Sequence, residues 1–172
     1  MSKFSVRDLT LAAMLAAVYA VLTMALPIPQ YGGVQIRFAE ALTVLPFLFP
    51  AATPGLFVGC IIANLFSPFV LDVVFGSMAT LLACLVTYKL RDIRVKGLAI
   101  PASLPPVVFN MLIVGAFEIT FFFSDTAPTL ALACFNAVAV AIGELISCTV
   151  LGVALVKLIE SNESLKKIFT EE

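Results

Sequence analysis

Residues 34–47 read VQIRFAEALTVLPF and contain the two features that decide the fold of this chain: a long apolar run and a pair of charged side chains at its start. From Phe38 onward the stretch is almost entirely apolar, yet Arg37 and Glu40 stand three residues apart at its start. On a helix this spacing places both side chains on one face, where they can touch. Charged side chains within an apolar segment are costly in a membrane, so they mark candidate functional positions.

The composition assigns the whole chain to the membrane proteins. Of its 172 residues, 62% are hydrophobic and 12% are charged, and the mean hydropathy is +1.12. Soluble domains carry about 25% charged residues. In the hydrocarbon the backbone must satisfy its own hydrogen bonds, which leaves helices or a closed barrel. Long apolar runs without two-residue alternation favour helices, so we expect an all-α integral membrane protein.

Six apolar segments follow one another, and no change of composition marks a domain boundary within residues 1–172. The segments cover about residues 8–26, 38–49, 53–71, 73–90, 98–123 and 128–159. A full crossing needs about 20 residues. The second segment is therefore too short to cross unaided, and it must tilt, be shielded by its neighbours or continue into the preceding loop. The sequence predicts one domain, a bundle of six transmembrane helices.

Basic residues predict the orientation of this bundle. Six crossings place nine of the ten lysines and arginines on one side, and Arg37 alone on the other. Lysine and arginine gather on the cytoplasmic side, so both termini are expected there. The outer loop 27–36, PIPQYGGVQI, is either a connector or a mobile lid hinged at its two glycines. The candidate lid residues are Tyr31, Gly32, Gly33 and Gln35.

Polar side chains at membrane depth outline a candidate pocket. Glu118 and Glu144 lie inside predicted helices with no neighbour in sequence to neutralise them, and a central carboxylate costs about 2.5 to 3.5 kcal/mol on insertion scales. Each must face the interior, carry a proton or meet a partner, and a hydrogen bond between helices is the structural alternative. The candidate substrate-binding residues are Arg37, Glu40, Asn64, Asp72, Asn110, Glu118, Asn136 and Glu144.

Two similar runs relate the fifth and sixth segments. FNMLIVGAFE ends at Glu118, and FNAVAVAIGE ends at Glu144. In antiparallel helices joined near residue 127, a rise of about 1.5 Å per residue sets Asn110 level with Glu144, and Asn136 level with Glu118. Two carboxylate–amide pairs are therefore predicted to face one space. Together with an aromatic ring, these pairs would suit a flat ligand rich in N–H donors, such as a guanine-like base. A proton relay or an amino-acid site would use similar groups.

Motifs for catalysis and for ATP use are absent from the sequence. The chain has no histidine, no GxxxxGK[ST] phosphate loop and no GxSxG. Cys60, Cys84, Cys134 and Cys148 lack CxxC spacing, and we interpret them as packing residues rather than metal ligands or disulfides. We expect no enzyme activity, no cofactor and no metal. Uphill transport would then draw on an ion gradient or on a partner.

Small residues recur every four positions on the first predicted helix. Ala12, Ala16 and Ala20 form one stripe, with Ala13 and Ala17 beside it. Such residues let another helix approach closely. Packing within the chain is one interpretation. Because the helix is terminal, all five alanines are also a candidate partner-docking face.

Two stretches resemble the QueT family, whose members are substrate-binding (S) components of energy-coupling factor (ECF) transporters. They are VQIRFAEALTVLPFLFPAATPGLFVGCIIANLFSP, residues 34–68, and LDVVFGSMATLLACLVTYKLR, residues 71–91. The resemblance extends from about residue 12 to residue 153. It implies six helices with cytoplasmic ends, a multi-pass position in the bacterial plasma membrane, and a pocket near the outer face covered by the first loop.

The same resemblance implies a cargo and partners. The cargo would be a queuosine precursor of the 7-deazaguanine type, such as its aminomethyl form. The partners would be an ECF transmembrane coupling protein, docked on the small-residue face of the first helix, and two ATPase subunits. S components for different ligands share one scaffold, so the cargo could instead be another vitamin. Two rival hypotheses are a self-sufficient ion-coupled carrier, and a membrane enzyme or assembly factor without a transported ligand.

Roles within the pocket can be expected on this basis. Glu40 would accept donors of the ligand or order the lid, and Arg37 would pair with Glu40 or Asp72. Glu118 and Glu144 would take the purine edge and the cationic arm, in either order. The asparagines would complete the site.

Overall fold

The computed structural model describes residues 5–25 and 35–170, and these residues form helices joined by short connections. The α-helices are α1 (Val6–Ala25), α2 (Ala52–Asn64), α3 (Phe75–Lys89), α4 (Ile100–Phe109), α5 (Leu130–Glu144), α6 (Val153–Ser161) and α7 (Glu163–Thr170). Two tight 3-10 segments are η1 (Phe38–Phe47) and η2 (Val70–Val73), and two wider π-type segments are η3 (Asn110–Phe123) and η4 (Leu145–Gly152). No strand occurs within the described ranges, so the prediction of an all-α protein is confirmed.

Four helical stretches are long and apolar enough to cross a membrane. They are Val6–Ala25, Val70–Lys89, Ile100–Phe123 and Leu130–Ser161, with 20, 20, 24 and 32 residues. The remaining apolar helices, η1 and α2, have 10 and 13 residues. The third predicted segment, residues 53–71, is longer than the helix in the structure, because α2 ends at Asn64 and a turn precedes η2. Pro68 lies in this turn, and proline has no N–H with which to continue a helix.

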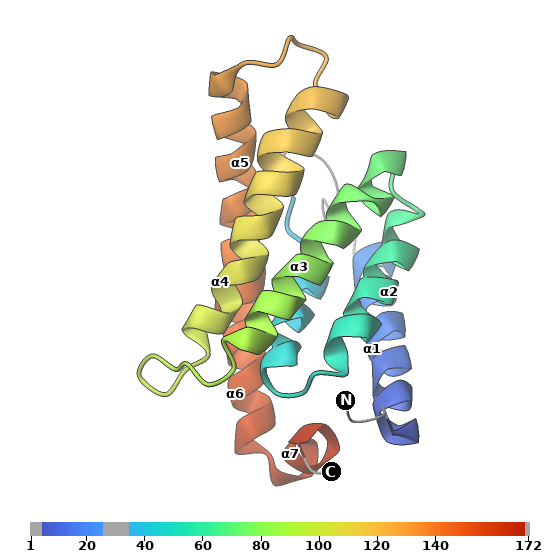
Figure 1. Cartoon of the computed structure of the whole chain (residues 1–172), viewed down its shortest axis with the longest axis vertical. Helices are drawn as coiled ribbons and strands as arrows, with labels where there is room; N and C mark the ends of the chain where they lie inside the picture. Colours follow the sequence, from blue (N-terminus) through green and yellow to red (C-terminus); the bar gives the residue numbers. More distant parts are fainter. Residues whose placement is uncertain (1–4, 26–34, 171–172) are drawn as a thin grey trace.

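The short helix η1 lies inside the bundle rather than against lipid. All residues from Ala39 to Phe47 are buried, and η1 contacts α1, α2, α3, α4, η4 and α6. In Figure 1 its cyan ribbon lies among these helices. Irregular or short helices at membrane depth are tolerated where protein surrounds them. Shielding by neighbours is thus how this short segment is accommodated.

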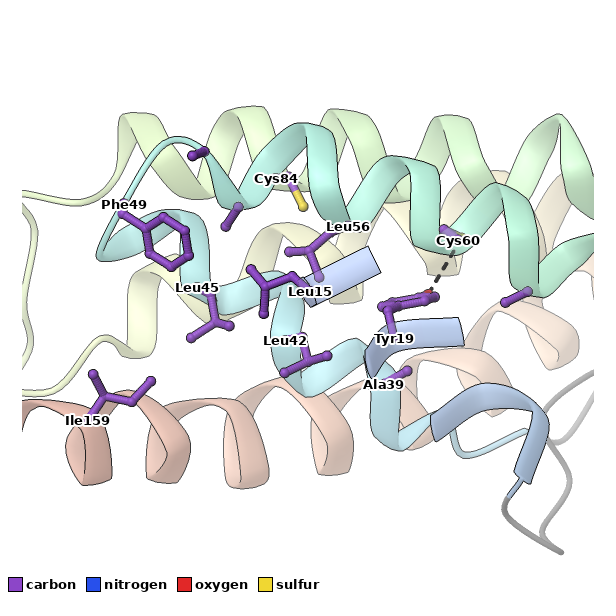
Figure 2. Close-up of a cluster of buried hydrophobic side chains, with 13 residues drawn as sticks. Leu15, Tyr19, Ala39, Leu42, Leu45, Phe49, Leu56, Cys60, Cys84 and Ile159 are labelled. Carbon is purple, nitrogen blue, oxygen red and sulfur yellow. Dashed lines mark hydrogen bonds between the residues drawn. The ribbon is translucent and has the colours of Figure 1, made fainter. Parts of the chain in front are cut away.

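Helices α1 and α2 pack in very close contact around two glycines. A Cβ atom on Gly55 would lie 2.4 Å from the carbonyl oxygen of Ala12, and one on Gly59 would lie 2.7 Å from that of Ala16. Only glycine permits this approach. Beside it, Leu15, Tyr19 and neighbouring side chains form the main apolar core, shown in Figure 2.

This packing corrects part of the predicted docking face on α1. Ala12, Ala16 and Ala20 are buried, so their stripe faces the inside of the same chain. Ala13 and Ala17 are exposed on the outside of the bundle. The four-residue period correctly showed that Ala12, Ala16 and Ala20 share one face of α1. That face packs on α2 of the same chain.

Both ends of the described chain lie at one end of the bundle. Figure 1 shows the start of α1, the α3–α4 connection and α7 together there. Two long-range contacts join them: Arg94 Nη2 lies 2.6 Å from Glu160 Oε1, and Arg7 donates to the carbonyl oxygen of Ile168 at 2.8 Å. The basic residues of this end are therefore part of a connected surface.

Candidate functional site

The structure buries all eight residues of the predicted pocket. Among the described residues, the buried charged side chains are Arg37, Glu40, Asp72, Glu118 and Glu144, and the buried asparagines are Asn64, Asn110 and Asn136. Glu40 and Glu118 have no exposed surface at all. Buried charges of this kind are rare in membrane helices and mark functional positions.

Arg37 and Asn64 tie the start of η1 to the corner between α2 and α3. An Arg37 Nη2 group donates to Asn64 Oδ1, and Asn64 Nδ2 donates to the backbone oxygen of Asp72 at 2.8 Å. Gly76 allows this arrangement, because a Cβ there would lie 2.9 Å from Asn64 Nδ2. Glu40 and Asp72 both interact electrostatically with Arg37. The predicted pairing is therefore seen as an attraction between nearby charges, whereas the hydrogen bond from Nη2 goes to Asn64.

Glu40 is held by residues that sequence reasoning missed. The hydroxyl of Tyr19, itself fully buried, donates to Glu40 Oε1. The same hydroxyl lies 3.5 Å from Cys60 Sγ, which also accepts from Thr80 Oγ1 at 3.3 Å. Figure 2 shows Tyr19 of α1 pointing to Cys60 of α2. A tyrosine among alanines and leucines was the available signal, because a buried hydroxyl needs a partner.

Glu144 meets Glu40 across the bundle. Carboxylate oxygens of Glu40 and Glu144 and the sulfur of Cys148 all lie within 4.8 Å of one another. Cys148, one helical turn beyond Glu144, donates its thiol to Glu144 Oε2 at 3.3 Å and to the backbone oxygen of Glu40 at 3.3 Å. Cys60 and Cys148 thus belong to the polar cluster, so interpreting all four cysteines as packing residues was too simple.

Glu118 and Asp72 make a second acidic pair. The charge of Asp72 acts on Glu118, and Asp72 Oδ2 accepts a hydrogen bond from Ser67. Neither oxygen of Glu118 has a hydrogen-bond partner in the described part of the chain. The cluster therefore contains two acidic pairs, one at Glu40 and one at Asp72, with Arg37 between their charges.

The two predicted carboxylate–amide pairs have different outcomes. Asn110 lies beside Glu144 as expected. Asn136 Nδ2 donates to Thr120 Oγ1 at 3.1 Å, two residues from Glu118. The helices are neighbours, since a Cβ on Gly115 would lie 2.9 Å from Ala137 Cα.

The predicted lid falls partly outside the described residues. Tyr31, Gly32 and Gly33 are outside the residues that the structure describes. Gln35 is buried, and its backbone oxygen would lie 2.0 Å from a Cβ on Gly143. The backbone that enters η1 therefore packs directly on α5, one residue before Glu144.

Unpartnered polar atoms give the cluster its chemical character. Glu40 Oε2, both oxygens of Glu118 and Asn110 Nδ2 are buried and lack hydrogen-bond partners among residues 5–25 and 35–170. More than 90% of buried polar groups in proteins are satisfied. Three free acceptors and one free donor in an apolar bundle are equipped to bind a small molecule rich in N–H groups.

Comparison with known proteins agrees with a transport role. The family model described as QueT transporter matches residues 9–161. The search of curated proteins and the search of solved structures found no match. The matched range contains all eight candidate pocket residues, most of α1 and every helix from α2 to α6. With its four long apolar helices, this chain is a multi-pass membrane protein and belongs to the QueT transporter family.

Proposed function

We propose that this chain is the substrate-capture subunit of an ECF-type ABC importer. It binds a queuosine precursor of the 7-deazaguanine type in an outward pocket, and a separate ATPase-driven coupling module releases the cargo inside. Family membership supports transport. The observation that carries the binding role is the set of unpartnered, buried acceptors on Glu40 and Glu118.

The chemistry of these acceptors favours a guanine-like ligand. The two free oxygens of Glu118 can accept two adjacent N–H groups in parallel, and guanine presents its ring N–H and amino group in that arrangement. The free Nδ2 of Asn110 can donate to a ring carbonyl. Since Glu144 Oε2 already accepts from Cys148 while both Glu118 oxygens lack partners among the described residues, Glu118 is the better candidate for the purine edge.

The basic end of the bundle supports an orientation in the bacterial plasma membrane. The α3–α4 connection, with its basic residues, lies at the end that also carries α7, and the positive-inside rule favours the cytoplasm for that end. The corner between α2 and α3 lies at the opposite end in Figure 1. The chain crosses six times, with η1 and α2 as short crossings inside the protein, and the pocket opens outward.

Docking of the coupling protein is proposed on the exposed side of α1. Ala13 and Ala17 leave a shallow surface there between larger side chains such as Met14 and Val21. A helix of the coupling protein can approach closely at such residues. Two ATPase subunits would complete the importer, because the chain itself has no phosphate loop.

The test is a calorimetric titration of the purified chain with 7-aminomethyl-7-deazaguanine, in parallel with queuine, guanine and a B vitamin. Tight binding of a deazaguanine without any ATPase subunit is the expected result. Binding of the vitamin instead would make the chain an S component for another cargo. Uptake into liposomes by this chain alone, driven by an ion gradient, would contradict the capture-subunit assignment.

A further inference from the structure

The buried cluster contains more acidic than basic groups. Its four carboxyl groups, on Glu40, Asp72, Glu118 and Glu144, stand against one buried guanidinium, Arg37, among the described residues. If all were ionised, the cluster would hold three negative charges in excess. Uncompensated charge inside an apolar bundle costs several kcal/mol. The cluster therefore needs protons or a positively charged ligand.

Glu40 and Glu144 form a close pair within this cluster. Their carboxylate oxygens lie within 4.8 Å of each other, and two carboxylates that share a site do not both remain ionised without a counter-charge. A charge-assisted N–H···O hydrogen bond is about 2.8 Å long. One ammonium nitrogen can therefore bridge oxygens up to about 5.6 Å apart, which includes this pair.

The described residues leave part of this pair without hydrogen bonds. Tyr19 donates to Glu40 Oε1, and Oε2 has no hydrogen-bond partner among residues 5–25 and 35–170. Cys148 donates to Glu144 Oε2. Independently of the acids, Asn110 is almost completely buried and faces Glu144, and its Nδ2 makes no hydrogen bond of normal geometry within the described residues. An unpartnered amide at this position points to a ligand that carries an acceptor next to its positive group.

Other titratable groups around the pair do not supply the missing charge. The groups that act on Glu40 or Glu144 from the surrounding elements are Tyr19, Arg37, Cys60, Cys84 and Cys148. The hydroxyl and the thiols are neutral near pH 7. The single charge of Arg37 also acts on Asp72 and Glu118, so it cannot compensate all four carboxylates. Helix α4 contains no titratable residue.

We propose that Glu40 and Glu144 form a subsite for a single positive charge. In the empty protein the pair holds one proton, and in the loaded protein it holds a primary ammonium group, so binding releases that proton. Charge balances: the singly protonated pair and the pair with one ammonium both carry one net negative charge. Placing the ammonium on an aminomethyl deazaguanine rests on the proposed function, whereas the proton in the empty pair does not.

The first experiment uses the protein without any ligand. Infrared spectra of wild-type protein at neutral pH are compared with spectra of Glu144→Gln, and Asp125→Asn removes an exposed carboxyl as the matched control. We expect a protonated-carboxyl band that loses the intensity of one carboxyl group in Glu144→Gln and is unchanged in Asp125→Asn. An identical band in wild type and Glu144→Gln would overturn the proposal, as would a metal ion retained by the purified protein.

The second experiment measures proton release during binding. Titration with 7-aminomethyl-7-deazaguanine in two buffers of different ionisation enthalpy is expected to show about one proton released per ligand, and none for the neutral nitrile analogue or for Glu144→Gln. Binding with equal heats in both buffers would overturn the inference and leave the proposed function intact. Absence of binding by any deazaguanine would contradict the proposed function, and the infrared result would still decide on the proton.

Discussion

Glu40 connects more of the site than any other residue. It accepts from Tyr19 of α1, its backbone oxygen accepts from Thr43 and Cys148, and its side chain faces Glu144. The sequence singled it out because a carboxylate stood at the start of an apolar segment. Its partners come from distant segments, and one-dimensional spacing could not identify them.

At this scale, replacing Glu118 by glutamine is expected to weaken deazaguanine binding about 10- to 150-fold. The reason is that a hydrogen bond to a charged acceptor contributes about 1.5–3 kcal/mol, and glutamine replaces one of the two free oxygens with a donor. Calorimetric titration measures the change. Asp125→Asn, in an exposed connection, serves as the control. Unchanged affinity of the Glu118→Gln protein would show that Glu118 does not contact the ligand.

At the scale of elements, the bundle depends on close contact between α1 and α2 and on the buried helix η1. Both follow from residue size: glycines at positions 55 and 59 remove the side chains that would separate the two helices. Helix η1 then occupies the interior, where its backbone is protected from lipid. The pocket residues of η1 are positioned by this packing rather than by local sequence.

Gly55→Ala tests the contact between α1 and α2. The new Cβ would lie 2.4 Å from the Ala12 carbonyl oxygen, so the helices must separate. Overpacking of this kind costs about 1–3 kcal/mol. We expect a lower midpoint of thermal unfolding in detergent than for the wild-type protein. An unchanged midpoint would mean that the helices are not in the contact described.

The exposed side of α1 has its own prediction. Ala13→Leu and Ala17→Leu should leave stability and ligand affinity unchanged, because both side chains point away from the bundle. They should reduce co-purification with the coupling protein and the ATPase subunits, since leucine prevents close helix approach. If both variants still assemble and transport normally, the coupling protein docks elsewhere.

At the scale of the whole molecule, one end of the bundle is basic and carries α7 and the start of α1. The opposite end carries the corner between α2 and α3, where the candidate site residues Asn64 and Asp72 are hydrogen-bonded to each other. The proposed capture subunit requires this difference between its two ends, with the basic end in the cytoplasm and the pocket toward the outer face.

Sidedness can be measured with cysteines introduced at exposed positions. In a variant without native cysteines, Thr126→Cys should react with a membrane-impermeant maleimide in intact cells. Lys96→Cys should react only after permeabilisation, because basic loops remain in the cytoplasm. The reverse pattern would invert the proposed orientation.

Composition and hydropathy by themselves determined that this chain is a helical membrane protein, because hydrocarbon excludes other open backbone structures. They also selected the eight polar residues that the structure buries. Only the tertiary structure decided which of them meet. It paired Glu144 with Glu40, directed Asn136 to Thr120 and turned Ala12 toward Gly55. Helical periodicity shows which residues share a face, but the packing of neighbouring helices and the π-type turns set where that face points.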